Sequence, residues 1–451
     1  MHKSGSEDFN YADYSCEELA MMASQISYGQ FKIDFHQEVL RQIMEQRPDD
    51  EHLINTFKLQ FIDALTMSGQ MFRIPQLFQE VDAYRESQWQ SELSPEFLYS
   101  FGWQYRNYID ALRDDPSVSA EELYSALAGM REFYVTQNDD MKSYYPRAYY
   151  VHKELGDEGV AAELRELWLQ APHSEFSDCA GCDPTHVVWM HAAIGDWQQA
   201  VAVGEQALDD PEVNCGAQPE NLELALLEPW LRTGDFESAD SGNSDAFLRN
   251  SEDPMYMEHF PAHFRFFALT GAMQPKKLVL GVELFSTFAE SYQKAESARV
   301  LMNLCAASDL LLAQAQKVLG KRMPKNLATT LPGAELLWID APTINNPTPS
   351  QAQQWCEEIA LGLAAKFDAR EGLRYPHVVN EVERLMYKTM PLSQIPTAGL
   401  WEMLNDEVLR ELLHNRSRSR VLLRIFFRSL PVSIIDLFRY KVKKTAKTDR
   451  S

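Results

Sequence analysis

A Gly-Asp pair returns along this chain at a fixed interval. It occurs at Gly156-Asp157, Gly195-Asp196 and Gly234-Asp235, and 39 residues separate each copy from the next. Five positions after its glycine, each copy has an alanine: Ala161, Ala200 and Ala239. A short signal at regular spacing is typical of repeat architectures, in which one small structural unit is stacked several times.

Each copy is predicted to be the turn between two helices. Glycine can adopt the left-handed backbone conformation that ends a helix, and aspartate accepts hydrogen bonds from free N–H groups at the start of the next helix. The alanine lets the second helix approach its partner closely. Because one helical pair cannot bury its own apolar face, neighbouring pairs stack into a continuous core. The sequence therefore predicts an all-α fold, a helical-hairpin repeat array of the α-solenoid kind.

Apolar periodicity agrees with this prediction. Leu164, Leu167 and Trp168 share one helical face because they are three and four residues apart. Alternating runs bounded by Asn-Gly or Asp-Gly turns, the usual signal for hairpin strands, do not occur in the sequence. We expect more than half of the residues in helices and no sheet of three or more strands.

One stretch, Met190–Leu208, resembles the middle of a tetratricopeptide repeat. The matching residues are Gly195, the aromatic Trp197 two positions later, and the alanines Ala200 and Ala207. The interval of 39 residues is longer than the usual repeat of about 34, and Val188 stands where a small residue is typical. The resemblance is therefore to a divergent, TPR-like array.

A longer string of motifs is similar to a group of uncharacterised bacterial tetratricopeptide-like proteins. The motifs follow the same order between residues 150 and 372, and they are Asp178-Cys179-x-x-Cys182, Gly195-Asp196, Cys215-x-x-Gln218-Pro219, Pro229-x-Leu231-Arg232-x-Gly234, His263-x-x-Phe266-x-Ala268-Leu269-Thr270-Gly271 and Ala364-x-x-Phe367-Asp368-Ala369-Arg370. The resemblance implies a fold and a general binding role. It implies no activity.

Composition divides the chain into five parts. Residues 1–15 are predicted to be a flexible acidic arm, and residues 16–322 the repeat body. Residues 323–350 are rich in Pro, Thr and Asn and are predicted to be a linker. Residues 351–440 are expected to form a C-terminal helical region that contains a basic amphipathic helix, and residues 441–451 form a basic tail.

The chain has the composition of a globular cytoplasmic protein. Of its 451 residues 45% are hydrophobic, which is enough for a buried core. No apolar run approaches the roughly 18 to 20 residues of a membrane span, and the polar N-terminus lacks the apolar core of a signal peptide. Six cysteines are thinly spread over the chain, so we expect reduced thiols.

Cys179-x-x-Cys182 is a candidate half of a zinc site, because two intervening residues let both thiolates reach one ion. Cys215, His186 or His191 could supply further ligands. A second pair at matching spacing is absent from the sequence, and buried free cysteines also suit a junction between helix and loop. The sequence favours structural packing over zinc and over a redox dithiol, and it predicts no cofactor.

Signatures of catalysis are not found. His259-x-x-x-His263 has zinc-ligand spacing on a helix, but the glutamate of metalloproteases is missing and Pro261 lies between the histidines. A capping or packing role is favoured for these residues. The sequence also lacks a phosphate-binding glycine loop and a Gly-x-Ser-x-Gly elbow. We predict that the protein is not an enzyme.

The predicted binding surface is the concave face of the array. In tetratricopeptide arrays this face is lined by first-helix residues roughly two, three and six positions before the turn glycine, an expectation that rests on the resemblance. The candidate partner-binding residues are Tyr150, Lys153, Trp189, Glu228 and Arg232. Tyrosine, tryptophan and arginine are the types that most often anchor interfaces.

A basic stripe is predicted near the C-terminus, where an arginine recurs every fourth residue: Arg416, Arg420, Arg424 and Arg428. From Arg410 onward the chain has 12 Lys+Arg and 3 Asp+Glu, whereas the preceding residues carry a net charge of −33. Such an acidic body repels nucleic-acid phosphates. The stripe could contact the acidic body or a second copy of it, a membrane surface or another acidic partner, or nucleic acid. The first reading is favoured.

These observations favour a scaffold or adaptor that binds a protein partner, whose identity the sequence does not reveal. The first alternative is a membrane-peripheral adaptor that uses the basic amphipathic helix. The second is an enzyme whose site is assembled from scattered residues. A transmembrane segment is not expected.

Overall fold

The computed structural model describes residues 11–88, 93–211, 215–250, 256–295, 297–333, 336, 338–370, 378–379 and 382. These residues form sixteen α-helices: α1 (Cys16–Gln25), α2 (Gln30–Gln46), α3 (Glu51–Thr66), α4 (Ile74–Ser87), α5 (Pro95–Asp114), α6 (Ala120–Thr136), α7 (Tyr144–Glu154), α8 (Glu158–Gln170), α9 (Asp183–Ile194), α10 (Trp197–Leu208), α11 (Glu220–Thr233), α12 (Phe236–Asn250), α13 (Tyr256–Thr270), α14 (Pro275–Phe288), α15 (Ala298–Leu319) and α16 (Pro349–Asp368).

The other regular elements are short. Four 3-10 helices occur: η1 (Tyr11–Asp13), η2 (Met71–Arg73), η3 (Ala289–Lys294) and η4 (Gly320–Arg322). The strands of the described residues are β1 (Thr330–Leu331) and β2 (Ile344–Asn345), which pair antiparallel. The predicted all-α fold is confirmed, and the described residues contain no sheet of three or more strands.

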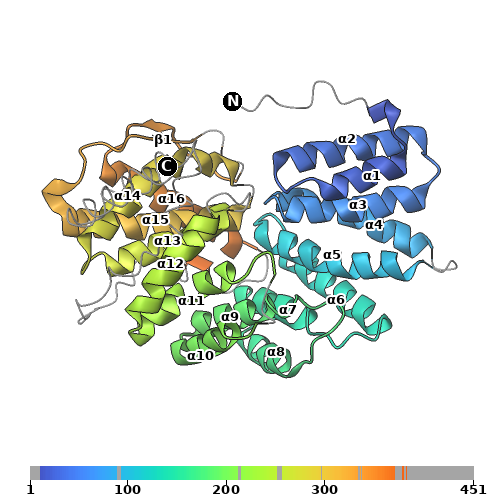
Figure 1. The fold of residues 1–451 in the computed structure, drawn as a ribbon, viewed down its shortest axis with the longest axis horizontal. Helices are drawn as coiled ribbons and strands as arrows, with labels where there is room; N and C mark the ends of the chain where they lie inside the picture. Colours follow the sequence, from blue (N-terminus) through green and yellow to red (C-terminus); the bar gives the residue numbers. More distant parts are fainter. Residues whose placement is uncertain are drawn as a thin grey trace, which may run out of the picture.

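The helices follow one another around an arc. Figure 1 shows α1–α6 on one side, α7–α10 along the bottom and α11–α16 on the other side. In the bottom part, α7 and α9 lie on the inner side of the arc, while α8 and α10 lie on the outer side. Each inner helix is therefore the first helix of a hairpin, as the repeat interval predicts.

The turn glycines have the predicted conformation. Gly156, Gly195 and Gly234 have φ angles of 83°, 81° and 91°, which lie in the left-handed region. Each one ends the first helix of a hairpin, and the aspartate that follows precedes the second helix. The backbone therefore reverses within two or three residues at each of the three sites, and the hairpin prediction is confirmed.

The aspartates cap the second helices in two of the three copies. Asp196 accepts a hydrogen bond from the N–H of Gln199, and Asp235 accepts one from the N–H of Ser238. Asp157 makes no such cap. Its carboxylate accepts from the hydroxyl of Tyr124 instead, and it lies 3.1 Å from Nδ1 of His152.

Close packing explains the alanine of each copy. The three alanines are fully buried or nearly so: Ala161, Ala200 and Ala239. Gly204 of α10 shows how near the helices come, because a Cβ atom at this position would lie 2.5 Å from a methyl carbon of Leu226 on α11. Small side chains at these positions allow consecutive helices to pack without a gap.

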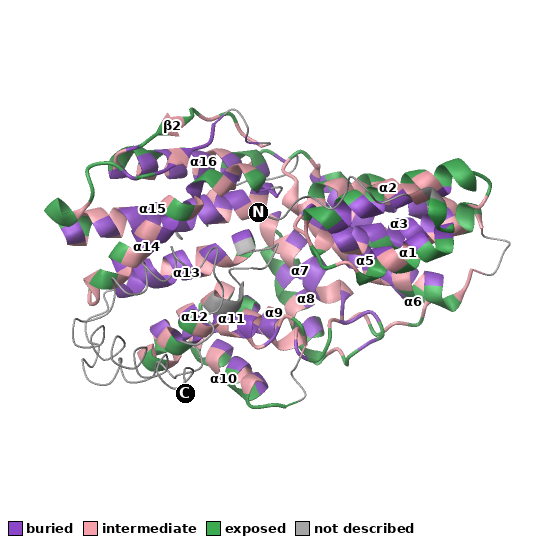
Figure 2. Ribbon diagram, turned by 45° about the horizontal axis from the view of Figure 1, so that its top comes forward, coloured by how far each residue is buried: buried purple, intermediate pink, exposed green. Residues whose placement is uncertain are grey.

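Two large apolar cores fill the array. One lies among α2–α9 and includes Met190, and the other lies among α9–α16 and includes Val188; a smaller core joins α1–α3. Figure 2 shows the buried residues gathered where neighbouring helices meet. Since Val188 and Met190 both belong to α9, this helix separates the two large cores.

The segment with linker composition, residues 323–350, packs on the second core. Leu327 and Leu331 are buried there. The N–H of Leu327 donates to the carbonyl oxygen of Pro347 at 2.7 Å. This hydrogen bond joins the beginning and the end of the segment next to the β1–β2 pair. These residues bring α16 back along α15, and the two helices pack against each other.

α15 is the longest described helix, with 22 residues. It packs against α13, α14 and α16, and its Ser308 shares a buried hydrogen bond with the hydroxyl of Tyr292. Along the part of the chain that the structure describes, no helix combines the length and the apolar character that crossing a membrane requires.

The left-handed turn predicts opposite effects for two glycine substitutions. Gly195→Ala should lower the free energy of unfolding by about 1 to 2 kcal/mol, because a Cβ is disfavoured at its φ of +81°. Gly159→Ala is the matched control: it lies within α8, also with no atom within 4 Å of an added Cβ, and should stabilise by about 0.5 to 1 kcal/mol. Urea unfolding measures both. Effects of equal sign would contradict the turn assignment.

Candidate functional site

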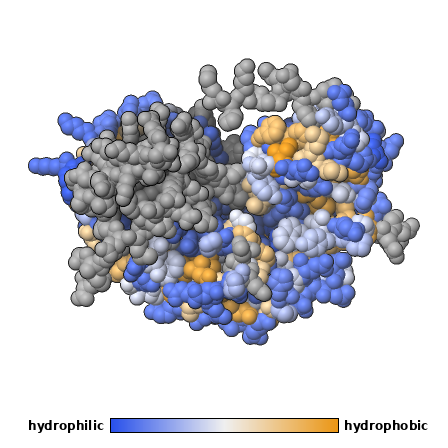
Figure 3. All heavy atoms as spheres, viewed as in Figure 1, coloured by the Kyte–Doolittle hydropathy of each residue, from blue (hydrophilic) through white to orange (hydrophobic). Residues whose placement is uncertain are grey.

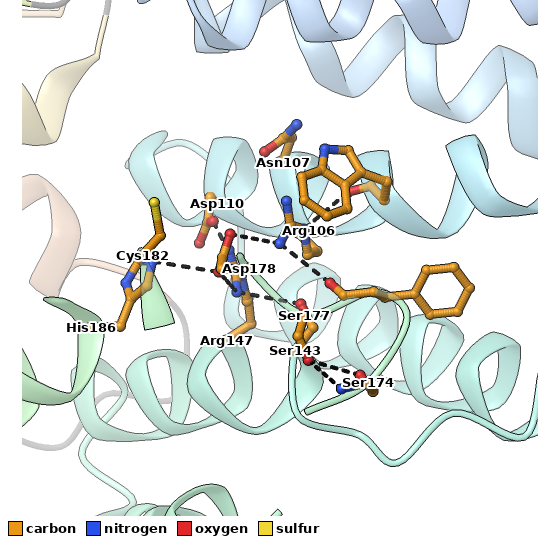
Figure 4. Close-up of polar contacts among 12 residues, drawn as sticks. Arg106, Asn107, Asp110, Ser143, Arg147, Ser174, Ser177, Asp178, Cys182 and His186 are labelled. Atoms are coloured by element: carbon orange, nitrogen blue, oxygen red, sulfur yellow. Dashed lines mark hydrogen bonds and ion pairs between the residues drawn. The ribbon is translucent and has the colours of Figure 1, made fainter. Parts of the chain in front are cut away.

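The loop between α8 and α9 places one carboxylate among several inner helices. Asp178 accepts a hydrogen bond from Arg106 of α5 at 2.7 Å, and its other oxygen lies 3.4 Å from Nη1 of Arg147 on α7. That same oxygen is 3.5 Å from Nε2 of His186 on α9. Figure 4 shows these side chains converging on Asp178 from three helices.

Burial and charge oppose each other at this carboxylate. Burial alone would raise the pKa of Asp178, but the guanidinium groups of Arg147 and Arg106 outweigh burial and hold the pKa well below its usual range. Burial lowers the pKa of His186, although Asp178 opposes that shift. The side chains of Arg106 and Arg147 are only 4% and 9% exposed. An ionised Asp178 is therefore what compensates two buried positive charges.

The same network continues along α5 and α7. Nε of Arg147 lies 3.4 Å from Asp110, and Asp110 in turn lies 3.3 Å from Arg113. Nε of Arg113 is 3.5 Å from Glu154 at the end of α7. Charges of opposite sign alternate along this row, so each side chain is held between partners of opposite charge.

Residues of the C-terminal half complete the network. Arg299 of α15 donates to Glu154 at 2.7 Å and to Asp114 at 2.9 Å. Arg370, just after α16, donates to backbone carbonyl oxygens at the end of α5, those of Leu112, Arg113 and Asp115. A cation at these free carbonyls is favourable at a helix C-terminus. The two halves of the array are thus joined by charge-assisted hydrogen bonds.

Tyr150 and Lys153, two of the predicted partner-binding residues, are half-buried on α7. The guanidinium of Arg113 lies 5.3 Å from the centre of the Tyr150 ring, and Trp168 lies on another side at 6.2 Å. Lys153 lies over the ring of Tyr149 at 5.8 Å. The aromatic face of Tyr150 therefore already has a partner within the protein.

Glu228 and Arg232 of α11 are also paired. Glu228 accepts hydrogen bonds from Arg232 at 2.8 Å and from Arg265 at 2.6 Å. Arg232 lies over the ring of Trp197 at 5.3 Å. Burial would raise the pKa of Glu228, but the two arginines outweigh it and lower the pKa. The charge of Glu228 is therefore fully compensated, and the three side chains together carry one excess positive charge.

Trp189 differs from the other four predicted residues because it is exposed. Its relative exposure is 43%, and its ring meets the imidazole of His186 edge to face at 5.3 Å. Tyr150, Trp189 and Glu228 are each 39 residues apart and occupy equivalent places on α7, α9 and α11. Of the five predicted residues, only Trp189 is exposed, and the assignment of all five to partner binding stays a prediction.

Sequence reasoning missed the centre of the network. Arg106 and Asp178 are 72 residues apart, and Arg299 and Glu154 are 145 residues apart, so no local spacing relates them. The available signal was indirect, since Asp178 and Arg370 both belong to the motifs that carried the family resemblance. These motifs indicated a shared fold and gave no role to either side chain.

The structure gathers three thiols near this network. Sulfur atoms of Cys179, Cys182 and Cys215 lie within 4.8 Å of one another. The histidines weighed as further ligands lie elsewhere: His186 faces Asp178, and His191 is 3.6 Å from Asp196. The Cys179–Cys182 pair is thus extended by Cys215 and by no other Cys, His, Asp or Glu among the described residues.

His263 of the His259–His263 pair lies in the core. It is 1% exposed, its Nδ1 is 2.8 Å from Oδ1 of Asn243, and its ring meets Phe247 at 5.2 Å. Burial lowers its pKa to about 3, and the charge of His259 acts in the same direction. These contacts give His263 a packing role.

Apolar side chains also gather on the N-terminal helices, as Figure 3 shows. The exposed ones include residues of two neighbouring turns: Tyr28, Phe31, Met67 and Phe72. The N–H of Gly29 donates to the hydroxyl of Ser68 and ties these turns together. The predicted arginine stripe, Arg416, Arg420, Arg424 and Arg428, lies outside the described residues.

Removing the negative charge of Asp178 should lower the stability of the protein. Asp178→Asn leaves two buried guanidinium groups without their shared partner, so we expect the free energy of unfolding to fall by about 3 to 5 kcal/mol. Glu166→Gln is the control, because Glu166 pairs with Arg165 at the surface with 59% exposure and should change stability by less than about 1 kcal/mol. Chemical denaturation compares them. Similar losses in both variants would show that Asp178 is not central.

The buried histidine predicts a pH dependence of stability. Because His263 has a pKa of about 3 in the fold and about 6.5 when unfolded, its stabilising contribution is complete above pH 6.5 and is lost as the pH falls toward 3. Between pH 7.5 and 5 the loss is about 2 kcal/mol. His263→Gln should make the unfolding free energy less dependent on pH over that range. An unchanged pH dependence in the variant would contradict this assignment.

Comparisons with known proteins do not identify this chain. Neither family models nor curated proteins gave a match. The likeness to tetratricopeptide proteins accordingly stands on the motifs quoted above and stays a prediction.

Proposed function

We propose that this protein is a non-catalytic scaffold that binds a protein partner on its inner helices α7 and α9 and on α11, which packs against α9. The observation that carries the proposal is Trp189, a tryptophan that is 43% exposed on an inner helix. Large aromatic side chains are costly to leave in water, and at interfaces they contribute more binding energy than most residues.

The surroundings of Trp189 suit an apolar segment of a partner. Ala192 and Ala193, on the same helix, are half-buried and small, and Ile194 is 44% exposed. On α11, the charge of Glu228 is paired with two arginines. A partner would thus meet an apolar centre with a polar border, which is the usual anatomy of a binding surface.

Trp189 is also held in place before binding. Its ring rests against His186, and His186 faces the buried carboxylate of Asp178. A side chain that is already ordered loses less conformational entropy when a partner binds. The rigid network beneath the surface therefore supports a binding role for the tryptophan.

The proposal also includes the compartment and the kind of scaffold. The acidic composition and the thinly spread cysteines of the sequence support a cytoplasmic adaptor of the tetratricopeptide type. The membrane-peripheral and enzymatic alternatives have no observation among the described residues that favours them, and we do not propose them.

Replacing the tryptophan should abolish partner binding without unfolding the protein. Trp189→Ala should reduce recovery of partner proteins in affinity purification by about tenfold or more, the loss expected for an interface anchor. Leu167→Ala is the matched control, since Leu167 is 47% exposed on the outer helix α8. Mass spectrometry quantifies the partners, and circular dichroism checks the fold. If both variants bind the same partners as strongly as the original protein, this surface is not the binding site.

A further inference from the structure

We propose that Cys179, Cys182 and Cys215 form a zinc site that fastens the loop before α9 to the turn before α11. The three sulfur atoms lie within 4.8 Å of one another. They come from two segments that are 33 residues apart at Cys182 and Cys215, so the fold itself brings them together.

The spacing of the sulfur atoms fits one tetrahedral ion. Zinc–sulfur bonds of about 2.3 Å in tetrahedral geometry place two ligand sulfurs roughly 3.8 Å apart. Cys182 and Cys215 have their sulfur atoms 3.6 Å apart. A disulfide would require about 2.05 Å. The separation of Cys182 and Cys215 is therefore close to that of two ligands on one ion and too long for a disulfide.

The backbone around Cys179 turns both thiols of the pair to the same place. The N–H groups of Cys182 and Asp183 donate to the carbonyl oxygen of Cys179 at 2.9 Å and 3.1 Å, which makes a tight turn at the start of α9. The sulfur atoms of the pair and of Cys215 are therefore close enough to reach one ion.

A buried amide holds the second cysteine in position. Nε2 of Gln218 lies 3.8 Å from the sulfur of Cys182 and donates to the hydroxyl of Thr185 at 2.9 Å. Its Oε1 accepts from the N–H of Leu222 at 3.0 Å, which fixes the orientation of the amide. Such outer contacts orient metal ligands in proteins.

Exposure separates this cluster from packed cysteines. Cys16, Cys305 and Cys356 are 3%, 0% and 0% exposed and lie in the cores. Cys179 is exposed, and Cys182 and Cys215 are half-buried. The sequence favoured structural packing for the Cys179–Cys182 pair, but packing does not account for three thiols gathered at a surface.

Thiolates select zinc among the common divalent cations, because soft sulfur ligands in tetrahedral geometry suit it. Three cysteines leave the fourth position for water or for a group from a partner. Zinc held here would fix the loop that carries Asp178, and with it the start of α9. The site would therefore help to position the inner surface.

Metal content tests the proposal directly. Protein purified under reducing conditions without chelators should contain about one zinc ion per chain. Cys182→Ser and Cys215→Ser should each lose most of it, whereas the control Cys16→Ala should keep it. Cobalt added to metal-free original protein should give thiolate-to-cobalt charge-transfer absorption, which reports thiolate ligands even if the serine variants fail to fold.

Three results would overturn the zinc site. These are purified protein without metal and without the cobalt–thiolate absorption, serine variants that fold and keep their zinc, and a disulfide between Cys182 and Cys215 that forms in place of metal binding. None of these measurements uses partner capture. Failure of the zinc site and failure of the proposed binding surface are therefore distinguished.

Discussion

The inner helices around α9 are held together by the ion pairs that one half-buried carboxylate, Asp178, makes with two buried arginines. Arg106 and Arg147 come from different helices, and each is almost fully withdrawn from water. Two such charges would repel each other and could not stay buried alone, because desolvation costs several kcal/mol per ion. Asp178 compensates both, and since it belongs to the loop before α9, it also determines where the next hairpin begins.

The series of ion pairs extends from Asp178 into the C-terminal half of the protein. In an open solenoid each repeat contacts only its neighbours, and stability is close to a sum of local terms. Here Arg299 bonds a carboxylate 145 residues away, and Arg370 bonds carbonyl oxygens more than 250 residues away. These contacts close the arc, so the two halves should unfold together and not repeat by repeat.

The sequence could predict the features that depend on the backbone conformation or the size of a single residue. Gly195 and Ala200 act through their own backbone conformation and their own small size, so periodicity alone revealed the hairpins. The prediction that Tyr150 binds a partner rests on the resemblance to tetratricopeptide arrays and stays a prediction. That resemblance carries no information about Arg113, which comes from an earlier helix and lies 5.3 Å from the centre of the Tyr150 ring. Contacts between distant segments, such as Asp178 with Arg106 or Cys182 with Cys215, arise only from the complete fold and leave no periodic signal.

The position of α9 between the two large cores has a mechanical consequence. Val188 packs into one core and Met190 into the other, so contacts with both cores hold the helix in position. Turning α9 or sliding it along its axis would disturb the packing of both halves at once. Trp189 lies between these two residues in the sequence, so the packing of both cores also holds its backbone in position. If the proposed surface binds a ligand, that ligand has to fit a tryptophan on a helix whose position both cores fix.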